Sequence, residues 1–124
     1  MAVPILKQGP VLIASIQTAL TDTDVLQLRE DVMSQVTRHR SRGIIVDVTA
    51  LDVMDSFVSR SLQGISRMTR LRGAETVIVG IQPEVAFAMV QLGMSFEDVS
   101  TALDLEEGLA LLTRPRKEAG DGGG

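Results

Sequence analysis

Acidic residues and a serine gather after an apolar segment, where α/β proteins commonly bind ligands. Asp47 lies within that segment, GIIVDV, and Asp52 and Asp55 follow it. Such carboxylates hold Mg²⁺ in phospho-aspartate receivers, and oxygen ligands suit that ion. A receiver also needs acids after an earlier strand and a lysine after a later one, but those places read QT and GIQPE. The sequence therefore favours a solvated loop, and we expect no metal and no cofactor.

Ser56 stands where a helix should begin, and two roles are open for it. In the first, Ser56 or Asp55 caps the helix by accepting a backbone N–H. In the second, Ser56 is an exposed hydroxyl at the positive end of the helix, where backbone donors favour a phosphate. Phosphorylation would add roughly −1.5 to −2 charges at neutral pH. Since Asp52 and Asp55 are already negative, we expect the phosphate to act outward, on a docked partner.

The sequence gives little support for a conventional catalytic site. His39 is the only histidine, and it lies among arginines near a predicted helix end, where it suits the helix dipole. Cysteine is absent, which excludes thiolate metal sites and cysteine nucleophiles. No Gly-rich phosphate loop is present, and the glycines at or within the predicted elements are scattered singly, among them Gly43, Gly64, Gly73, Gly80 and Gly93. We therefore predict no catalytic residues and no enzymatic activity.

The composition of the chain argues against some classes of binding partner. The chain has 124 residues, a formal net charge of −4 and three aromatic residues, all phenylalanine. An acidic chain with few aromatics suits neither phosphate backbones nor base stacking, so we expect no nucleic-acid partner. No signal peptide is visible, and no apolar stretch approaches the ~18 residues of a membrane span. The expectation is a cytoplasmic protein without a membrane partner.

Strand-like and helix-like segments alternate along the chain. VPILK and VLIASI read as a hairpin, GIIVDV and TVIVGI as buried strands, and EDVST as a short fifth strand. One helix should begin at TDTD (21–24) and end near RHRSRG, with Gly43 as the terminating residue. A second should begin at Ser56, a third at Pro83, and a fourth at Asp104, where Glu107 completes a capping box.

Helical spacing indicates which side chains face the core. The predicted stripes are Val25, Leu28, Val32 and Val36; Val58, Leu62, Ile65, Met68 and Leu71; Val85, Met89 and Leu92; and Leu105, Leu109 and Leu112. Alternating strands and helices predict an α/β fold: a mostly parallel central sheet with an N-terminal antiparallel hairpin and about four helices. We expect a single domain over residues 1–113 and a disordered tail over 114–124.

From about Val3 to Leu112 the chain resembles the STAS domain family, the fold of anti-sigma-factor antagonists, and within it the RsbS-type scaffold proteins of the bacterial stressosome. The resemblance lies in GIIVDVTALDVMDSFVSRSLQGISRM, ETVIVGIQPEVA and LDLEEGL. The sequence Asp55-Ser56-Phe57 matches the family's phospho-acceptor motif. The resemblance thus implies that Ser56 is a phosphorylation site.

It also implies a function. Such scaffolds co-assemble with sensor paralogues that carry the same domain at their C-terminus, and the large complex sequesters a serine/threonine switch kinase of the histidine-kinase-like ATPase superfamily. Phosphorylation releases the kinase, and a phosphoserine phosphatase resets the complex. The alternative is a simple soluble antagonist that binds an anti-sigma kinase one-to-one.

The sequence indicates less clearly which residues contact a partner. Asp55, Phe57, Arg60 and Arg67 lie on or near the predicted helix that begins at Ser56, and we name them as candidate partner-binding residues. Core packing is the more ordinary role for Phe57, and a solvated face is the ordinary role for the two arginines. A second acceptor near the first helix, at Thr21 or Thr23, stays open.

Overall fold

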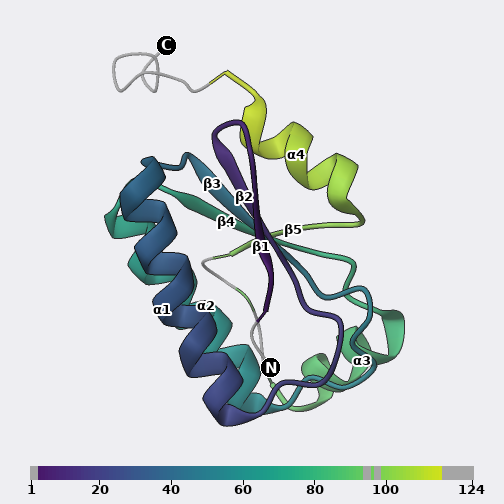
Figure 1. Cartoon of the computed structure of the whole chain (residues 1–124). Helices are drawn as coiled ribbons and strands as arrows, with labels where there is room; N and C mark the ends of the chain where they lie inside the picture. The colour runs from purple at the N-terminus through teal and green to yellow at the C-terminus, as the bar shows by residue number, and fades with distance from the viewer. Residues whose placement is uncertain (1–2, 94–95, 97–98, 116–124) are drawn as a thin grey trace.

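Apolar segments build a five-stranded sheet in the order β1-β2-β3-β4-β5 (Figure 1). The computed structural model describes residues 3–93, 96 and 99–115. Its strands are β1 (Ile5–Gln8), β2 (Val11–Ser15), β3 (Gly43–Asp47), β4 (Glu75–Val79) and β5 (Ser100–Ala102). β1 pairs with β2 antiparallel, and all other neighbours are parallel. The predicted hairpin and mostly parallel sheet are confirmed.

The helices cover both faces of the sheet. They are α1 (Asp22–His39), α2 (Ser56–Leu71), α3 (Pro83–Gln91) and α4 (Leu105–Thr113). Figure 1 shows α1 and α2 side by side on one face and α4 on the other. Alternate strand residues point to opposite faces and so build two cores. Leu12, Ile44 and Ile78 pack with the stripes of α1, α2 and α3, whereas Ile45 and Val77 pack with Leu112 of α4.

The end of α1 differs from the prediction. Arg40, not Gly43, takes the left-handed conformation that ends the helix, with φ 48° and its N–H bonded to the Val36 carbonyl. Gly43 is instead the first residue of β3. A Cβ there would lie 2.6 Å from a methyl carbon of Leu112, so glycine is needed for α4 to approach the sheet. Close packing between distant segments, and not helix termination, explains this glycine.

Two predicted core residues are exposed. Leu71 is 87% exposed because it is the last residue of α2, and Leu92 is 69% exposed because α3 has ended at Gln91. The remaining members of the predicted stripes are buried or half-buried. Helical spacing therefore predicted the buried side chains correctly within the helices and wrongly at the ends of α2 and α3.

The last predicted strand and the tail lie partly outside the described residues. β5 begins at Ser100, within the predicted segment at 97–101 but after its start, and residues 97 and 98 are not described. Of the predicted tail, residues 116–124 are likewise outside the described part of the chain. Within the described part, no helix is long and apolar enough to cross a membrane.

Candidate functional site

Ser56 is the first residue of α2, and its side chain is exposed. The cap is Asp55, whose carboxylate accepts the N–H of Val58 at 2.8 Å. The Asp55 carbonyl also accepts the N–H of Ser59 at 3.0 Å. Because Asp55 performs the capping, the Ser56 hydroxyl is not needed to begin the helix. The question left open by the sequence, which of the two residues caps, is thus answered in favour of Asp55.

The loop between β3 and α2 is anchored at its start by Thr49. The Asp47 carboxylate accepts hydrogen bonds from the Thr49 N–H at 2.9 Å and from its hydroxyl at 2.6 Å. The Gln82 side-chain amide donates to the Thr49 carbonyl at 2.8 Å, which ties this loop to the loop after β4. Between them stands Gly80, at φ 80°, where a Cβ would lie 2.0 Å from the Thr49 hydroxyl oxygen. These contacts determine where the chain leaves the sheet toward Ser56.

Two buried apolar side chains anchor the rest of the loop to the core. Leu51 is 4% exposed and Met54 7% exposed, and both belong to the core beneath α1 and α2. Val53, between them, is 70% exposed. The loop therefore buries alternate apolar residues and leaves Asp52, Asp55 and Ser56 in solvent. A rigid base with an exposed hydroxyl suits a residue that another protein must reach.

A groove between α1 and α2 adjoins the candidate site. It encloses about 380 Å³ and is lined by Val25, Leu26, Arg29, Phe57, Arg60, Ser61, Gly64 and Met68. Phe57 is half-buried and packs against the core while forming part of the groove wall. Arg60 is exposed and also lines the groove, whereas Arg67 is exposed but does not. Of the four candidate partner-binding residues, the structure thus brings Phe57 and Arg60 together in one surface beside Ser56.

Comparison with known proteins identifies the family. The family model for the STAS domain matches residues 2–108. This protein belongs to the STAS domain family. Two solved structures also resemble this STAS domain over most of their length. A Ser-to-Glu variant of RsbS from Moorella thermoacetica has a TM-score of 0.77 and 37% identity, covering 89% of this chain and 93% of that one. A chain from a structure described as the molecular architecture of the stressosome, a signal integration and transduction hub, has a TM-score of 0.75 and 38% identity. The match covers 88% of this chain and 95% of that one.

Two curated relatives are much longer proteins. The RsbT co-antagonist protein RsbRA of Bacillus subtilis (strain 168) is 32% identical over 83 residues, which are 67% of this chain and 30% of the relative. RsbRD of the same organism, also named an RsbT co-antagonist, is 32% identical over 81 residues, or 65% of this chain and 29% of the relative. This STAS domain therefore spans less than a third of the length of these relatives. Their names are those of regulatory proteins.

The aspartates in the described part of this STAS domain do not converge on a metal site. Asp47 bonds to Thr49, and Asp55 caps α2. Among residues 3–93, 96 and 99–115, no group of at least three histidine, aspartate or glutamate side chains could hold a metal ion. The observed hydrogen bonds give Asp47 and Asp55 structural roles in the loop.

The threonines near α1 occupy unequal positions. Thr21 is the helix cap: its hydroxyl accepts the Asp24 N–H at 3.1 Å, and its own N–H donates to the Asp24 carboxylate at 3.0 Å. Thr23 lies in the first turn and is exposed. A phosphate on Thr21 would therefore disrupt a capping box, whereas one on Thr23 would not.

Sequence reasoning missed the anchoring of the Ser56 loop. Gln82 follows Thr49 by 33 residues, Gly80 by nearly as many, and none of the three belongs to a motif. Only the parallel pairing of β3 with β4 places the ends of these strands together. A signal was available in Gly80, since an isolated glycine at a strand end often marks a close approach of two segments.

Proposed function

We propose that this STAS domain protein is a non-enzymatic scaffold of a stressosome-type signalling complex, which sequesters a serine/threonine switch kinase and releases it when Ser56 is phosphorylated. The observation that carries the proposal is the exposed Ser56 hydroxyl at the start of α2. Support also comes from the likeness to RsbS and to a stressosome chain at 37% and 38% identity. Further relatives are named co-antagonists of RsbT.

The position of Ser56 suits a switch that leaves the fold intact. At the first turn of a helix, a phosphate lies near the positive end of the helix dipole. The cap at Asp55 does not involve the Ser56 hydroxyl, so phosphorylation breaks no hydrogen bond of the cap. Arg60 lies one helical turn further along, at i+4, and is the nearest cation in the sequence. The added charge thus changes the surface while the core stays as it is.

The effect on a docked partner follows from the neighbouring surface. Phe57 and Arg60 line the groove between α1 and α2, directly beside Ser56. A phosphate on Ser56 brings about −1.5 to −2 charges to the rim of this groove. It also draws Arg60 toward itself and away from a partner. We therefore propose that the groove and the exposed side of α2, with Arg67, contact the kinase, and that phosphorylation weakens this contact. Asp55 contributes as the rigid cap that places Ser56 there.

The test uses a purified serine/threonine switch kinase. After incubation with the kinase and ATP, mass spectrometry should place the phosphate on Ser56, and Ser56→Ala should remove it. Ser56→Asp should reduce kinase capture, measured by surface plasmon resonance, while Ser56→Ala should preserve it. Ser34→Asp is the matched control because Ser34 is an exposed residue of α1 and receives the same charge elsewhere. Phosphate at other residues with none on Ser56 would refute the proposal.

The size of the complex separates the scaffold from a one-to-one antagonist. Size-exclusion chromatography with a sensor paralogue should give a species far larger than the sum of the two chains if the protein is a scaffold. A species containing one copy of each chain would instead support the simple antagonist. Reversal of Ser56 phosphorylation by a phosphoserine phosphatase from the same genome would complete the cycle.

A further inference from the structure

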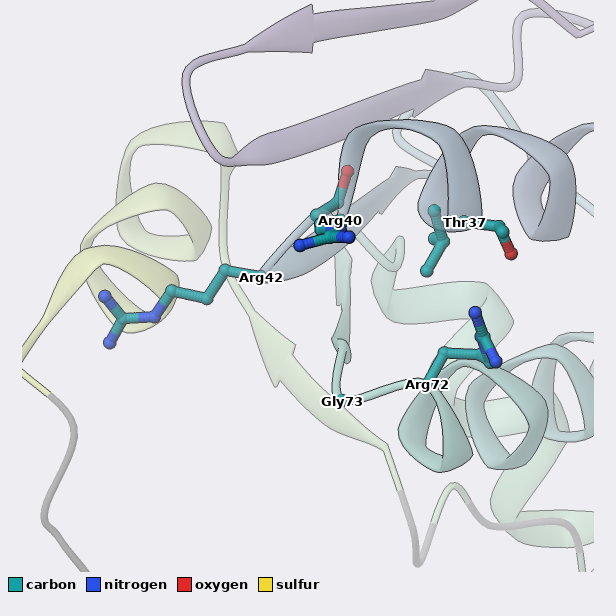
Figure 2. Close-up of a pocket in the computed structure, with 7 residues that line it drawn as sticks. Thr37, Arg40, Arg42, Arg72 and Gly73 are labelled. Carbon is teal, nitrogen blue, oxygen red and sulfur yellow. The ribbon is translucent and has the colours of Figure 1, made fainter.

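A second hollow lies at the end of the strands opposite to Ser56. It encloses about 500 Å³ between the ends of α1 and α2 and is lined by Val36, Thr37, Arg40, Ser41, Arg42, Arg72 and Gly73 (Figure 2). Arg42 directly precedes β3, and Arg72 and Gly73 shortly precede β4, so the hollow is at the amino ends of these strands. Ser56 follows the carboxyl end of β3. The two sites are therefore separate.

The hollow is strongly basic although the chain as a whole has a net charge of −4. Neither residues 32–46 nor residues 56–74 contain an aspartate or glutamate. Glu75 directly follows the second of these runs, and its carboxylate accepts a hydrogen bond from the Ser100 hydroxyl at 3.0 Å. Arginines gathered without acids repel one another, and a bound anion relieves that repulsion.

Backbone N–H groups, and not arginine side chains, cap the ends of α1 and α2. The carbonyl of Val36 at the end of α1 accepts the backbone N–H groups of Arg40 and Ser41. At the end of α2, the carbonyl of Thr69 accepts the backbone N–H of Arg72. Those carbonyls are satisfied by the backbone, which leaves the guanidinium groups of Arg40 and Arg72 available for a ligand. Within the described part of the chain, the guanidinium groups of Arg40 and Arg72 make no hydrogen bond or ion pair.

The conformation of Arg40 is a further observation in favour of a ligand. It is the one residue other than glycine with positive φ in the described part of the chain. Glycine is the usual residue at such a helix end, since a side chain there is strained. Figure 2 shows Arg72 reaching from the end of α2 toward Thr37 on α1, while Arg42 extends away toward α4. The Arg42 side chain donates a hydrogen bond to the carbonyl of Arg114.

We propose that this hollow binds a small molecule that carries a chain of two or more phosphates. Arg40 and Arg72 come from different elements and each can pair with one phosphoryl group through charge-assisted hydrogen bonds. The Thr37 hydroxyl, which also lines the hollow, adds a neutral donor. The volume exceeds that of a single phosphate and falls in the range of ligand pockets. The proposal does not depend on the function assigned to Ser56.

Titration with pyrophosphate, followed by isothermal calorimetry and by backbone amide NMR, tests the site on the full chain. We expect saturable binding, with chemical-shift changes confined to residues 36–42 and 70–73. The dissociation constant should rise about tenfold or more in Arg72→Gln, as expected for loss of a charge-assisted hydrogen bond. Added sodium chloride should weaken binding.

Two variants make the outcome decisive. Arg40→Gly should lose affinity to a similar degree while melting at the same or a higher temperature than the wild type, because glycine relieves the positive φ. Arg29→Gln, which removes an exposed arginine of the groove beside Ser56, should bind pyrophosphate as the wild type does. Failure to saturate, shifts spread over all arginines, or an equal loss in Arg29→Gln would overturn the proposal.

Discussion

Replacing Gly80 by alanine should destabilise the domain and displace the loop that leads to Ser56. Gly80 has φ 80°, and a Cβ there would lie 2.0 Å from the Thr49 hydroxyl oxygen. The left-handed backbone costs an alanine about 1–2 kcal/mol. Overpacking against Thr49 costs a further ~1–3 kcal/mol. The free energy of unfolding should therefore fall by about 2–5 kcal/mol, a large share of the ~5–15 kcal/mol of an ordinary domain.

Gly73 provides the matched control. Its φ is 83°, but a Cβ there would have nothing within 4 Å. Gly73→Ala should therefore lose only the backbone contribution, about 1–2 kcal/mol. Urea unfolding followed by circular dichroism measures both variants, and equal slopes with urea concentration would show that the folded and unfolded states are comparable. The difference between the two losses is the energy of the Thr49 contact.

The same variant connects stability with the proposed switch. If Thr49 must move, its hydrogen bonds to Asp47 and Gln82 are disturbed, and Ser56 loses its fixed position. Under conditions where both variants are folded, phosphorylation of Ser56 should slow more in Gly80→Ala than in Gly73→Ala. Equal losses of stability in the two variants would refute the reasoning, because they would mean that Thr49 does not restrict this position.

Other substitutions test single interactions. Asp55→Ala should lower the free energy of unfolding by about 1 kcal/mol through loss of the cap on the Val58 N–H, while Asp55→Asn should retain most of it; thermal unfolding compares them. Ser59→Ala should stabilise the domain by up to about 1 kcal/mol in urea unfolding, because the buried Ser59 hydroxyl has no hydrogen-bond partner in the described structure, and a loss of stability would contradict this. Thr76→Val should destabilise by about 1 kcal/mol, since the hydroxyls of Thr69 and Thr76 are 3.0 Å apart in the core; an unchanged urea midpoint would show that the Thr69 bond to its own helix suffices.

Local patterns predicted the elements well, because helical and strand periodicity depend on neighbouring residues. The order of strands and helices, the start of α2 at Ser56 and the proline in the first turn of α3 were all expected and are observed. The errors fall where periodicity carries no information. Leu71 and Leu92 stand at helix ends and are exposed, and Gly43 serves packing against Leu112.

The candidate site shows the same division. The exposed Ser56 and the acids around it could be found in the sequence, since a strand followed by a cap residue is a local signal. The groove of Phe57 and Arg60 with α1, and the contact of Gly80 with Thr49, required the helices and strands to be placed together. The basic hollow likewise joins Arg40 and Arg72, which lie in different segments of the chain.

The sequence by itself determined the fold class, the family resemblance and the position of the serine, because each is encoded in a contiguous run of residues. Tertiary structure alone decided that Asp55 and not Ser56 caps α2, that Gly43 and Gly80 admit close approaches, and that separate arginines share a hollow. The physical reason is that steric contacts and charge clusters arise between residues distant in the chain. Only the packed sheet and helices bring such residues within a few ångströms of one another.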